Sequence, residues 1–502
     1  MKLSDNNIRL IFGLKLKQLR LDRNLSLAEL ARRTSLSSSY LNEIENGKKY
    51  PKSDKIVALA DTLGVSYDKL VSLKLTKNLT PVSELLESNI LEQLPLDHYG
   101  IDIHKLLHQI SLAPLQLSAL VSTLIELAKG LEMTQNNFSK TAIRTYKELN
   151  ENYFPEIEDS VHNFSNKVDF IYKPPVEYNS ILNIFVKELN YEVKEDVIPD
   201  SPEFRTIRGI NIQNGRKKKL LLNKRLTDSQ KAFIIGKEIA YNYLNISERS
   251  HIYSNLRLDS FDQLLNNLKA SYFATALMIN REYLLDDIRI FFGNRSFDDI
   301  FLRSLLQKYN ASPEMLMQRL TNLLSRYFGI NIFFFHRFNS ETGSDTFNLL
   351  KEIRLNTKEN PGGYETSEHY CRRWQSINII KELEKIQYSE KKSNLIPVGI
   401  QRSVFKNSGN EYLTLSIAKE STLLKDTNYS VTLGFLMNDN LRQKVLFAND
   451  PSIPVKTIND TCERCHITDC KERIADPVVY ENKVRLQKLQ DTINKIIKEE
   501  SR

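Results

Sequence analysis

Residues 25–51 read LSLAELARRTSLSSSYLNEIENGKKYP, and this stretch decides the fold of the N-terminal region. Ser26 and Glu29 have the spacing of a capping box, in which the serine side chain accepts from the glutamate amide and the glutamate side chain reaches back to the serine amide. This pair predicts the start of a short helix over residues 27–34. A turn through Ser35 then leads out of that helix.

A second short helix is predicted directly after the turn. Ser37 is a favourable N-cap residue for a helix over residues 38–45. Asn46 and Gly47 follow, and glycine allows the left-handed backbone conformation that stops a helix. Two short helices with a tight turn between them form a helix-turn-helix, whose second helix can enter the major groove of DNA.

The residues around this pair complete a small all-α domain of five short helices between residues 8 and 73. Ile11, Leu14, Leu16 and Leu19 have the spacing of an amphipathic helix that ends just before the quoted stretch. The predicted core residues of the domain include Ala31, Leu41, Ile44 and Leu59.

The stretch from residue 25 to residue 70 resembles the DNA-binding domains of phage repressors and of the Xre family, and IENGKKYP is its most specific segment. The resemblance implies that the helix over 38–45 reads bases. It also implies that two residues, Arg20 and Lys48, lie near phosphates. The implied DNA-binding residues are Arg20, Ser37, Ser38, Ser39, Asn42, Glu43 and Lys48.

The chemistry of these side chains supports the implied roles unevenly. Asn42 can pair with the edge of an adenine and Glu43 can accept from a cytosine, whereas serines discriminate poorly between bases. Arg20 also has a structural interpretation, because it can form an ion pair with Glu45.

Charge is concentrated at the N-terminus. Residues 1–75 contain 14 lysines and arginines against 8 acidic residues, which gives this segment +6 of the chain's total of +8. A basic head on a nearly neutral body suits a nucleic-acid-binding domain. A solvated charged face is the alternative.

At 502 residues the chain is long enough for several domains. We expect a multidomain protein with the helix-turn-helix domain at 1–75, a helical connector or dimerisation region at 76–165, an α+β domain at 166–328 and an α+β sensor domain at 329–502. The first residues show no basic-then-apolar leader, and no apolar run is long enough to span a bilayer. We therefore expect a cytosolic homodimer, with leucine-rich segments of the connector as a candidate interface.

The third domain resembles the metalloprotease-like domain of IrrE-type regulators. The helix predicted after the Thr227 cap carries the sequence KEIAY where active relatives carry His-Glu-x-x-His, a zinc-binding arrangement. Lys237 and Tyr241 thus replace the two histidines, Glu238 keeps the base position, and Lys269 falls where the third ligand is expected. This set makes a poor zinc site, so we expect no protease activity. Glu238 either pairs with one of the lysines or faces solvent with them.

The last domain is predicted from short strand-like runs: INIFFFHRF, LIPVGIQRSVF, EYLTLSIAKES, YSVTLGFLMN and KVLFAND. A helix over 374–386 lies among them, and this pattern favours an α+β fold that resembles the GAF type. A final helix over 481–499 is expected to pack on the sensor or across a dimer, through Val484, Leu489, Ile493, Ile496 and Ile497.

Three of the chain's four cysteines, Cys462, Cys465 and Cys470, fall within nine residues of this domain. Clustered thiolates are typical ligands of soft metals, and Cys371 is the remaining candidate for a fourth ligand. A four-cysteine zinc site uses the same ligands, with His369 or His466 as substitutes. Free redox thiols are a third interpretation.

The segments HYCRRWQSINII, VGIQRSVF and CERCHITDCKERIADP resemble the ScfR-type short-chain fatty acyl transcriptional regulators. This bacterial family has an Xre head, an IrrE-like middle and a C-terminal domain with cysteines, in the same order as here. The resemblance implies control of short-chain fatty acid use (methylcitrate or glyoxylate type), an acyl-CoA effector and a 4Fe-4S cluster on the cysteines. It assigns the effector pocket to no particular residues.

The sequence thus predicts a non-enzymatic transcription regulator that binds double-stranded DNA and responds to acyl-CoA and redox state. A phage-type or stress repressor with a structural zinc site is the alternative. A zinc protease is disfavoured, because histidines are absent at positions 237 and 241.

Overall fold

The computed structural model describes residues 5–72, 135–170, 173–214, 217–254, 260–357, 368–389, 395–467 and 469–500. The chain divides into two compact units: residues 1–146 with 258–261, and residues 147–257 with 262–502. Most of the predicted connector, residues 76–134, lies outside the described residues. In the parts that are described, no helix is both long and apolar enough to cross a membrane.

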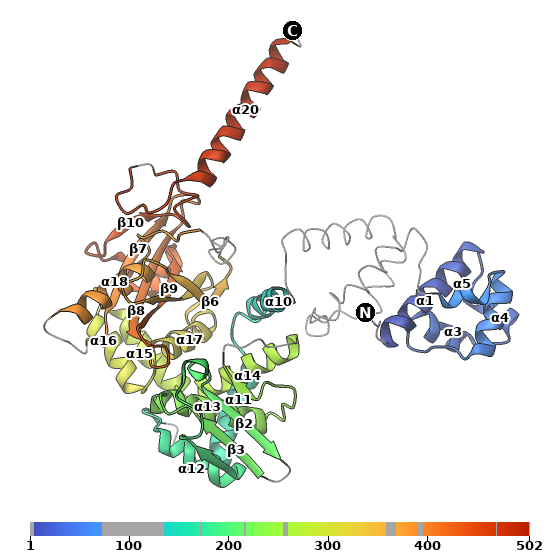
Figure 1. Ribbon diagram of the computed structural model, residues 1–502, viewed down its shortest axis with the longest axis horizontal. Helices are drawn as coiled ribbons and strands as arrows, with labels where there is room; N and C mark the ends of the chain where they lie inside the picture. The colour runs from blue at the N-terminus through green and yellow to red at the C-terminus, as the bar shows by residue number, and fades with distance from the viewer. Residues whose placement is uncertain are drawn as a thin grey trace. The chain divides into compact units, whose positions relative to one another are not determined.

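The N-terminal head has the five helices that the sequence predicts (Figure 1). The capping boxes and N-caps lie where expected: Ser26 and Glu29 bond each other's backbone amides, and Ser37 accepts from the amide of Tyr40. The helices are α1 (Asp5–Asp22), α2 (Leu27–Thr34), α3 (Ser38–Glu45), α4 (Ser53–Leu63) and α5 (Tyr67–Val71).

The core of the head forms where these helices cross. Leu30, Leu41, Ile44 and Leu59 are each 0% exposed, as the apolar spacing predicts. Helix α1 passes very close to α3 at Gly13, where an added Cβ would collide with the carbonyl oxygen of Ile44. Gly47 ends the helix-turn-helix with a φ of +69°.

The second unit begins with helices and a small sheet. Helix α10 (Gln135–Leu149) lies mostly in the first unit and ends in the second. The helices of the second unit that follow it are α11 (Pro155–Lys167), α12 (Tyr178–Leu189), α13 (Asp228–Tyr243), α14 (Phe261–Met278), α15 (Arg281–Gly293), α16 (Asp299–Lys308) and α17 (Pro313–Leu323), with a π-helical turn at Leu324–Phe328 and a 3-10 turn at Pro202–Phe204. The strands are β1 (Tyr191–Lys194), β2 (Gly209–Asn214), β3 (Lys217–Leu222) and β4 (Ile252–Tyr253).

These four strands form a sheet of order β1-β3-β2-β4, in which β1 and β3 are parallel and the other pairs are antiparallel. Thr227 and Gln230 form a capping box that starts α13, as the sequence predicts. A buried ion pair between Glu158 and Arg319, with Nη2 and Oε2 3.0 Å apart, joins α11 to α17.

A six-stranded sheet of order β10-β7-β8-β9-β5-β6 follows. Its strands are β5 (Phe333–Glu341), β6 (Asn348–Leu355), β7 (Val398–Phe405), β8 (Glu411–Glu420), β9 (Thr427–Leu436) and β10 (Val455–Ile458). Only the β10–β7 pair is parallel. The remaining helices are α18 (Gln375–Tyr388), α19 (Asp439–Lys444) and α20 (Val478–Glu500).

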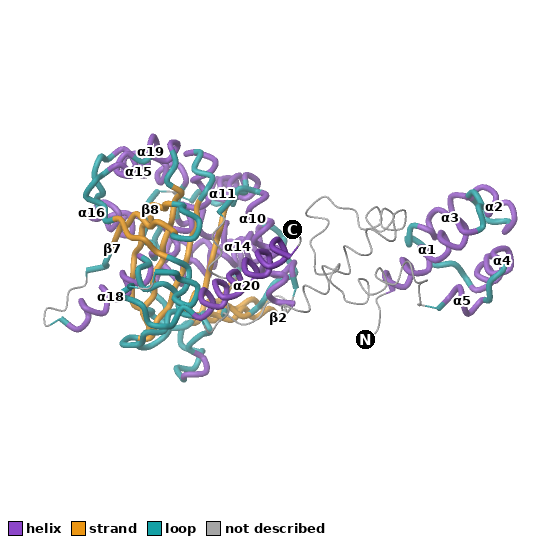
Figure 2. Tube along the Cα trace, turned by 90° about the horizontal axis from the view of Figure 1, so that it is seen from above, coloured by secondary structure: helices purple, strands orange, loops and turns teal. Residues whose placement is uncertain are grey.

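Helices cover both faces of this sheet (Figure 2). Side chains alternate along a strand, so β5 sends neighbouring residues to opposite faces. Phe334 and Phe338 pack with the residues of α18, whereas Arg337 reaches Glu314 of α17. The parts predicted as 166–328 and 329–502 therefore share one compact unit and pack on each other through α17.

The prediction of a strand at KVLFAND is wrong. Asn438 caps α19 by accepting from the amide of Leu441 at 2.8 Å, and a 3-10 turn over Leu446–Asn449 follows. Val445 and Phe447 are both buried, which a helical turn achieves as well as a strand does. The sequence interpretation also missed β6 and β10.

Candidate functional site

The polar face of α3 is open to solvent. Ser37, Ser38, Ser39 and Asn42 are all exposed, whereas the other side of this helix is in the core of the head. The Asn42 side chain is held by Asn46, whose Nδ2 donates to Asn42 Oδ1 at 3.0 Å. Ser38, Ser39 and Asn42 thus present hydrogen-bonding groups at the surface, whereas the Ser37 hydroxyl caps the helix.

Arg20 does not belong to this surface. Its guanidinium is buried and makes two bonds to the Glu45 carboxylate, at 2.7 and 2.9 Å, and a third to the carbonyl of Leu25. Glu45 raises the pKa of Arg20 through this hydrogen bond. The structural interpretation of Arg20 is therefore the correct one, because its donors already have acceptors inside the head.

Glu43 and Lys48 lie at the edge of the exposed face. Glu43 is half-buried and forms an ion pair with Lys49, with 2.7 Å between Nζ and Oε2. Lys48 is exposed. Several further basic side chains of the head are also exposed and were not singled out from the sequence: Arg32, Arg33, Lys49, Lys52 and Lys55.

In the second unit, the three side chains of the altered zinc motif on α13 are buried. Lys237, Glu238 and Tyr241 are 8%, 0% and 3% exposed. We expected Glu238 to pair with a lysine or to face solvent, and both expectations are wrong. Its carboxylate accepts from Arg249 Nη1 at 2.7 Å and from the hydroxyl of Tyr253.

Arg249 supplies the positive charge of this site. The guanidinium lies over the ring of Tyr241, 4.6 Å from its centroid. Although burial opposes it, the Glu238 carboxylate raises the pKa of Arg249. A cation of the chain itself thus lies beside the glutamate of the motif.

Helix α14 contributes a partner to the altered motif. Lys237 Nζ donates to Asn267 of α14. Lys269 lies two residues further along and is half-buried. Burial, together with the charges of Arg208 and Lys351, lowers the pKa of Lys237 to about 7.

Lys237 belongs to a group of cations that we call the basic cluster: Arg208, Lys237, Arg337 and Lys351. They come from four different elements, the turn before β2, then α13, β5 and β6. Glu314 of α17 is the carboxylate at their centre. It pairs with Arg337 and with Lys351, whose Nζ lies 3.3 Å from Oε1.

The basic cluster has more positive charge than its carboxylate can balance. Although burial opposes it, the charges of Arg337, Lys351 and Arg208 lower the pKa of Glu314 to about 2. Burial lowers the pKa of Arg208, whose guanidinium has no hydrogen-bond or ion-pair partner among the described residues. The Nε atom of Arg337 is likewise buried without an acceptor in the part of the chain that the structure describes.

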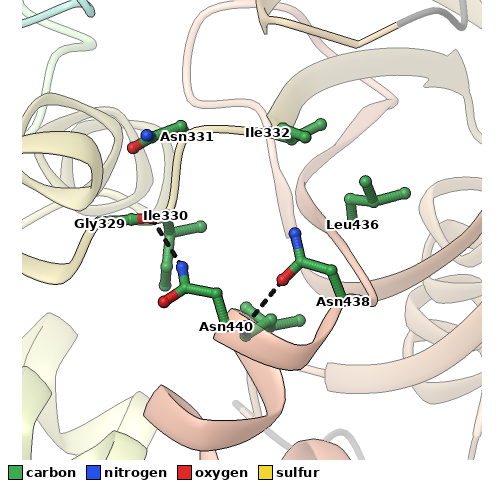
Figure 3. Close-up of a pocket in the computed structure, with 8 residues that line it drawn as sticks. Gly329, Ile330, Asn331, Ile332, Leu436, Asn438 and Asn440 are labelled. Carbon is green, nitrogen blue, oxygen red and sulfur yellow. Dashed lines mark hydrogen bonds between the residues drawn. The ribbon is translucent and has the colours of Figure 1, made fainter.

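A small cleft of about 190 Å³ lies elsewhere in this unit, between the start of β5 and α19 (Figure 3). Its asparagines already serve the fold, because Asn440 donates to the carbonyl of Gly329 at 2.7 Å and Asn438 caps α19. No charged side chain lines this cleft. It therefore lacks the groups that a polyanionic ligand needs.

The cysteines lie where two distant segments pair. Cys371 donates its amide to the carbonyl of Asp460, and Cys462 donates to the carbonyl of His369. Cys371, Cys462 and Cys465 are buried at 8%, 6% and 7% exposure. Burial, and to a smaller extent the neighbouring thiols, raises the pKa of Cys371 to about 11.

The four thiols suit a soft metal in their chemistry. Cys470 is the one that is partly exposed. Among the described residues, no group of three or more His, Cys, Asp or Glu side chains is arranged to hold a metal ion. His369 bonds Glu463 at 2.7 Å, and the ring of His466 lies beside Tyr480.

Arg473 holds the loop of residues 462–467 together through its backbone carbonyls. Its guanidinium donates to the carbonyls of Cys462, Cys465 and Ile467 at 2.8, 3.0 and 2.7 Å. Arg464 of the same loop forms an ion pair with Glu368, which lies in the segment that pairs with the loop.

Comparison with known proteins agrees with this geometry. Residues 16–70 match the helix-turn-helix family, and residues 199–321 match the IrrE N-terminal-like domain. Over 61 residues the chain is 41% identical to control protein C.BamHI of Bacillus amyloliquefaciens, which covers 12% of this chain and 75% of that protein. The chain belongs to the helix-turn-helix family.

A solved structure of a Mycobacterium tuberculosis transcriptional regulator is also similar, with 15% identity and a TM-score of 0.46 over 66% of this chain and 92% of the other. From the sequence matches alone, the present chain is a DNA-binding helix-turn-helix regulator that carries an IrrE N-terminal-like domain later in its sequence.

The residues that sequence reasoning missed in this helix-turn-helix protein share one property. Arg208 and Arg249 lie in loops and meet charged groups of other elements, Glu314 and Glu238. A single arginine in a loop gives no periodic signal in the sequence.

Proposed function

We propose that this protein is a transcription regulator whose operator affinity is controlled by an acyl-CoA effector of short-chain fatty acid metabolism. The observation that carries the DNA-binding part is the exposed polar row on α3, on a helix whose opposite side forms the core. A recognition helix needs this division, because base contacts require free donors and acceptors at the surface.

In this proposal Asn42 is the principal base-reading residue. The serines before it contact phosphates or bases less specifically, and Lys48 lies near the DNA backbone with the other exposed lysines of the head. Glu43 becomes available to a cytosine only after its ion pair with Lys49 opens, so its contribution is smaller.

The DNA-binding proposal is tested by capturing promoter fragments from the native genome with the full chain and then measuring affinity by fluorescence anisotropy. We expect one or a few fragments to bind more tightly than random DNA, with affinity that falls steeply with salt. Equal affinity for captured and random fragments would contradict sequence-specific regulation.

The effector part of the proposal relies on the basic cluster. An acyl-CoA carries phosphates, and phosphates are recognised by arginine and lysine side chains. The cluster has three permanent or nearly permanent cations and a fourth with a pKa near 7, around one carboxylate. Arg208 in particular is half-buried, and its guanidinium donates to no acceptor among the described residues.

Isothermal titration with acetyl-CoA, propionyl-CoA and free coenzyme A tests this site. Arg208→Gln and Arg337→Gln should each weaken acyl-CoA binding about 10- to 100-fold, because a charged hydrogen bond contributes about 1.5–3 kcal/mol. Arg289→Gln, on the exposed surface of α15, is the matched control. Unchanged binding in both cluster variants would move the effector site elsewhere.

We also propose that Cys371, Cys462, Cys465 and Cys470 hold an iron–sulfur cluster, with zinc as the alternative. Three of the thiols are buried where the segment at Cys371 pairs with the loop at Cys462 and Cys465. A bound cluster would supply one-electron redox chemistry. Anaerobically purified protein should contain iron and absorb broadly in the visible range, and Cys465→Ser should abolish both. A colourless protein with one equivalent of zinc would favour the alternative.

We propose finally that the IrrE-like part transmits a signal instead of cleaving peptides. Lys237 and Tyr241 cannot hold zinc as histidines do, and Glu238 is engaged by Arg249. A peptidase assay on denatured casein with added zinc should therefore show no cleavage. Zinc-dependent cleavage that Glu238→Gln abolishes would contradict this.

A further inference from the structure

The last helix, α20, carries a row of apolar side chains that nothing in the described chain covers. Leu486, Leu489, Ile493 and Ile496 are 63%, 57%, 40% and 53% exposed. The helix extends away from the rest of its unit (Figure 1). Contiguous exposed apolar surface of this kind marks an interaction site more often than a random surface.

The spacing of this row indicates the kind of partner. Leu486, Leu489, Ile493 and Ile496 are separated by three, four and three residues, which is the a/d repeat of a two-stranded coiled coil. Ile497 widens the same stripe. Val484, which we expected on this face, lies on the opposite side, because two residues correspond to about 200° of helical rotation.

The flanking charges select the partner and its direction. In an antiparallel pair that places Leu486 opposite Ile496 of the other helix, Arg485 lies opposite Glu499. Twofold symmetry repeats this pair, so two opposite-charge contacts form. In a parallel pair, Arg485 faces the uncharged Gln490 instead, and no charge complementarity results.

We propose that α20 pairs with the α20 helix of a second copy of this chain as an antiparallel two-stranded coiled coil. Its 23 residues span about 35 Å at about 1.5 Å per residue, which is short for a coiled coil. The contact is therefore reversible and suits a dimer whose geometry changes. This inference does not depend on the DNA-binding, effector or metal proposals.

The base of α20 is attached to the cysteine loop. The amides of Val479 and Tyr480 donate to the carbonyl of Glu463 at 3.1 and 3.0 Å, and Tyr480 lies beside the ring of His466. Glu463 lies between Cys462 and Cys465 in the sequence. A change in the conformation of this loop would thus alter the direction of α20 and the dimer contact at its far end.

Lysine cross-linking of the full chain tests the proposal. Equal amounts of ¹⁴N- and ¹⁵N-labelled protein are mixed, treated with a short amine-reactive cross-linker and digested, so that mixed-isotope peptides report contacts between copies. The antiparallel register places Lys483 near Lys498 and Lys488 near Lys495 of the second copy. We expect mixed-isotope links of these two kinds.

Two variants and a control make the test specific. Leu489→Glu/Ile493→Glu keeps good helix formers and should abolish both links, whereas Asp491→Asn, on the far side of the helix, should keep them. Arg485→Glu should weaken the links, and Arg485→Glu/Glu499→Arg should restore them. The proposal is wrong if mixed-isotope links are absent, if they join only identical lysines, or if Leu489→Glu/Ile493→Glu leaves them unchanged.

Discussion

Helices α3 and α13 each carry a recognisable motif, but the structure treats the two motifs in opposite ways. On α3 the motif side chains are at the surface, and Asn42 has no role in the core. On α13 the motif side chains are buried, and Glu238 and Lys237 are bonded to Arg249 and Asn267. We call the α3 motif open, because its polar groups are exposed and available to a partner molecule. We call the α13 motif closed, because its polar groups are bonded inside the protein and contribute to stability.

The largest expected effect is on the closed motif. Arg249→Leu leaves the Glu238 carboxylate buried without its cation, which typically costs about 3–5 kcal/mol of unfolding free energy. Urea denaturation of the full chain would measure this loss. The double variant Glu238→Leu/Arg249→Leu should recover part of it, because no unpaired charge remains.

A loss below about 1 kcal/mol in the single variant would show that water or another group replaces Arg249 easily. The buried motif of α13 would then contribute little to stability, and the contrast with the exposed motif of α3 would fail.

The open motif should respond in the reverse manner. Asn42→Ala should weaken binding to a captured operator by about 1–3 kcal/mol, because a bidentate adenine contact is lost. Its urea midpoint should not change, since the side chain is exposed. Ser39→Ala should weaken operator binding less than Asn42→Ala does. If Asn42→Ala lowered the stability of the head but left its DNA affinity normal, Asn42 would be a structural residue and not a base-reading one.

Measured per pH unit, the smallest predicted effect is the pH dependence from Lys237. Its pKa is about 7 in the folded chain and 10.5 when unperturbed, so the unfolded chain binds more protons between these values. Stability should therefore rise with pH from about 7 towards 10.5, by at most about 1.4 kcal/mol per pH unit from this group.

Lys237→Met should flatten that part of the pH profile and raise stability at pH 7. Lys488→Met, on the exposed C-terminal helix, is the control and should leave the profile as it is. An identical pH profile in Lys237→Met would assign the dependence to another group.

Local signals explain why the head could be predicted almost completely from the sequence. Ser26 and Ser37 each cap a helix of the head through a residue three positions away, as Thr227 does for α13 in the second unit, and such contacts are visible in the sequence itself. The apolar spacing then identified the core of the head.

Tertiary partners explain what could not be predicted. Arg20 pairs with Glu45 instead of lying at the DNA-binding surface, and Glu238 pairs with Arg249 instead of a lysine. Both are buried ion pairs, and the apolar periodicity of the sequence does not show which charged residues will pair. The basic cluster joins four elements over more than a hundred residues, and Cys371 meets its neighbours only through backbone pairing with the segment at Asp460.

The proposed link between effector and DNA is the central claim, and one coupling measurement tests it directly. Fluorescence anisotropy gives the Kd of a captured operator fragment with and without saturating propionyl-CoA, for the wild-type chain and for Arg208→Gln. We predict that propionyl-CoA changes the wild-type Kd by about 5-fold or more, as a coupling of about 1 kcal/mol or more requires, and leaves that of Arg208→Gln unchanged. An equal change in both proteins, or no change in the wild-type chain, would contradict the account.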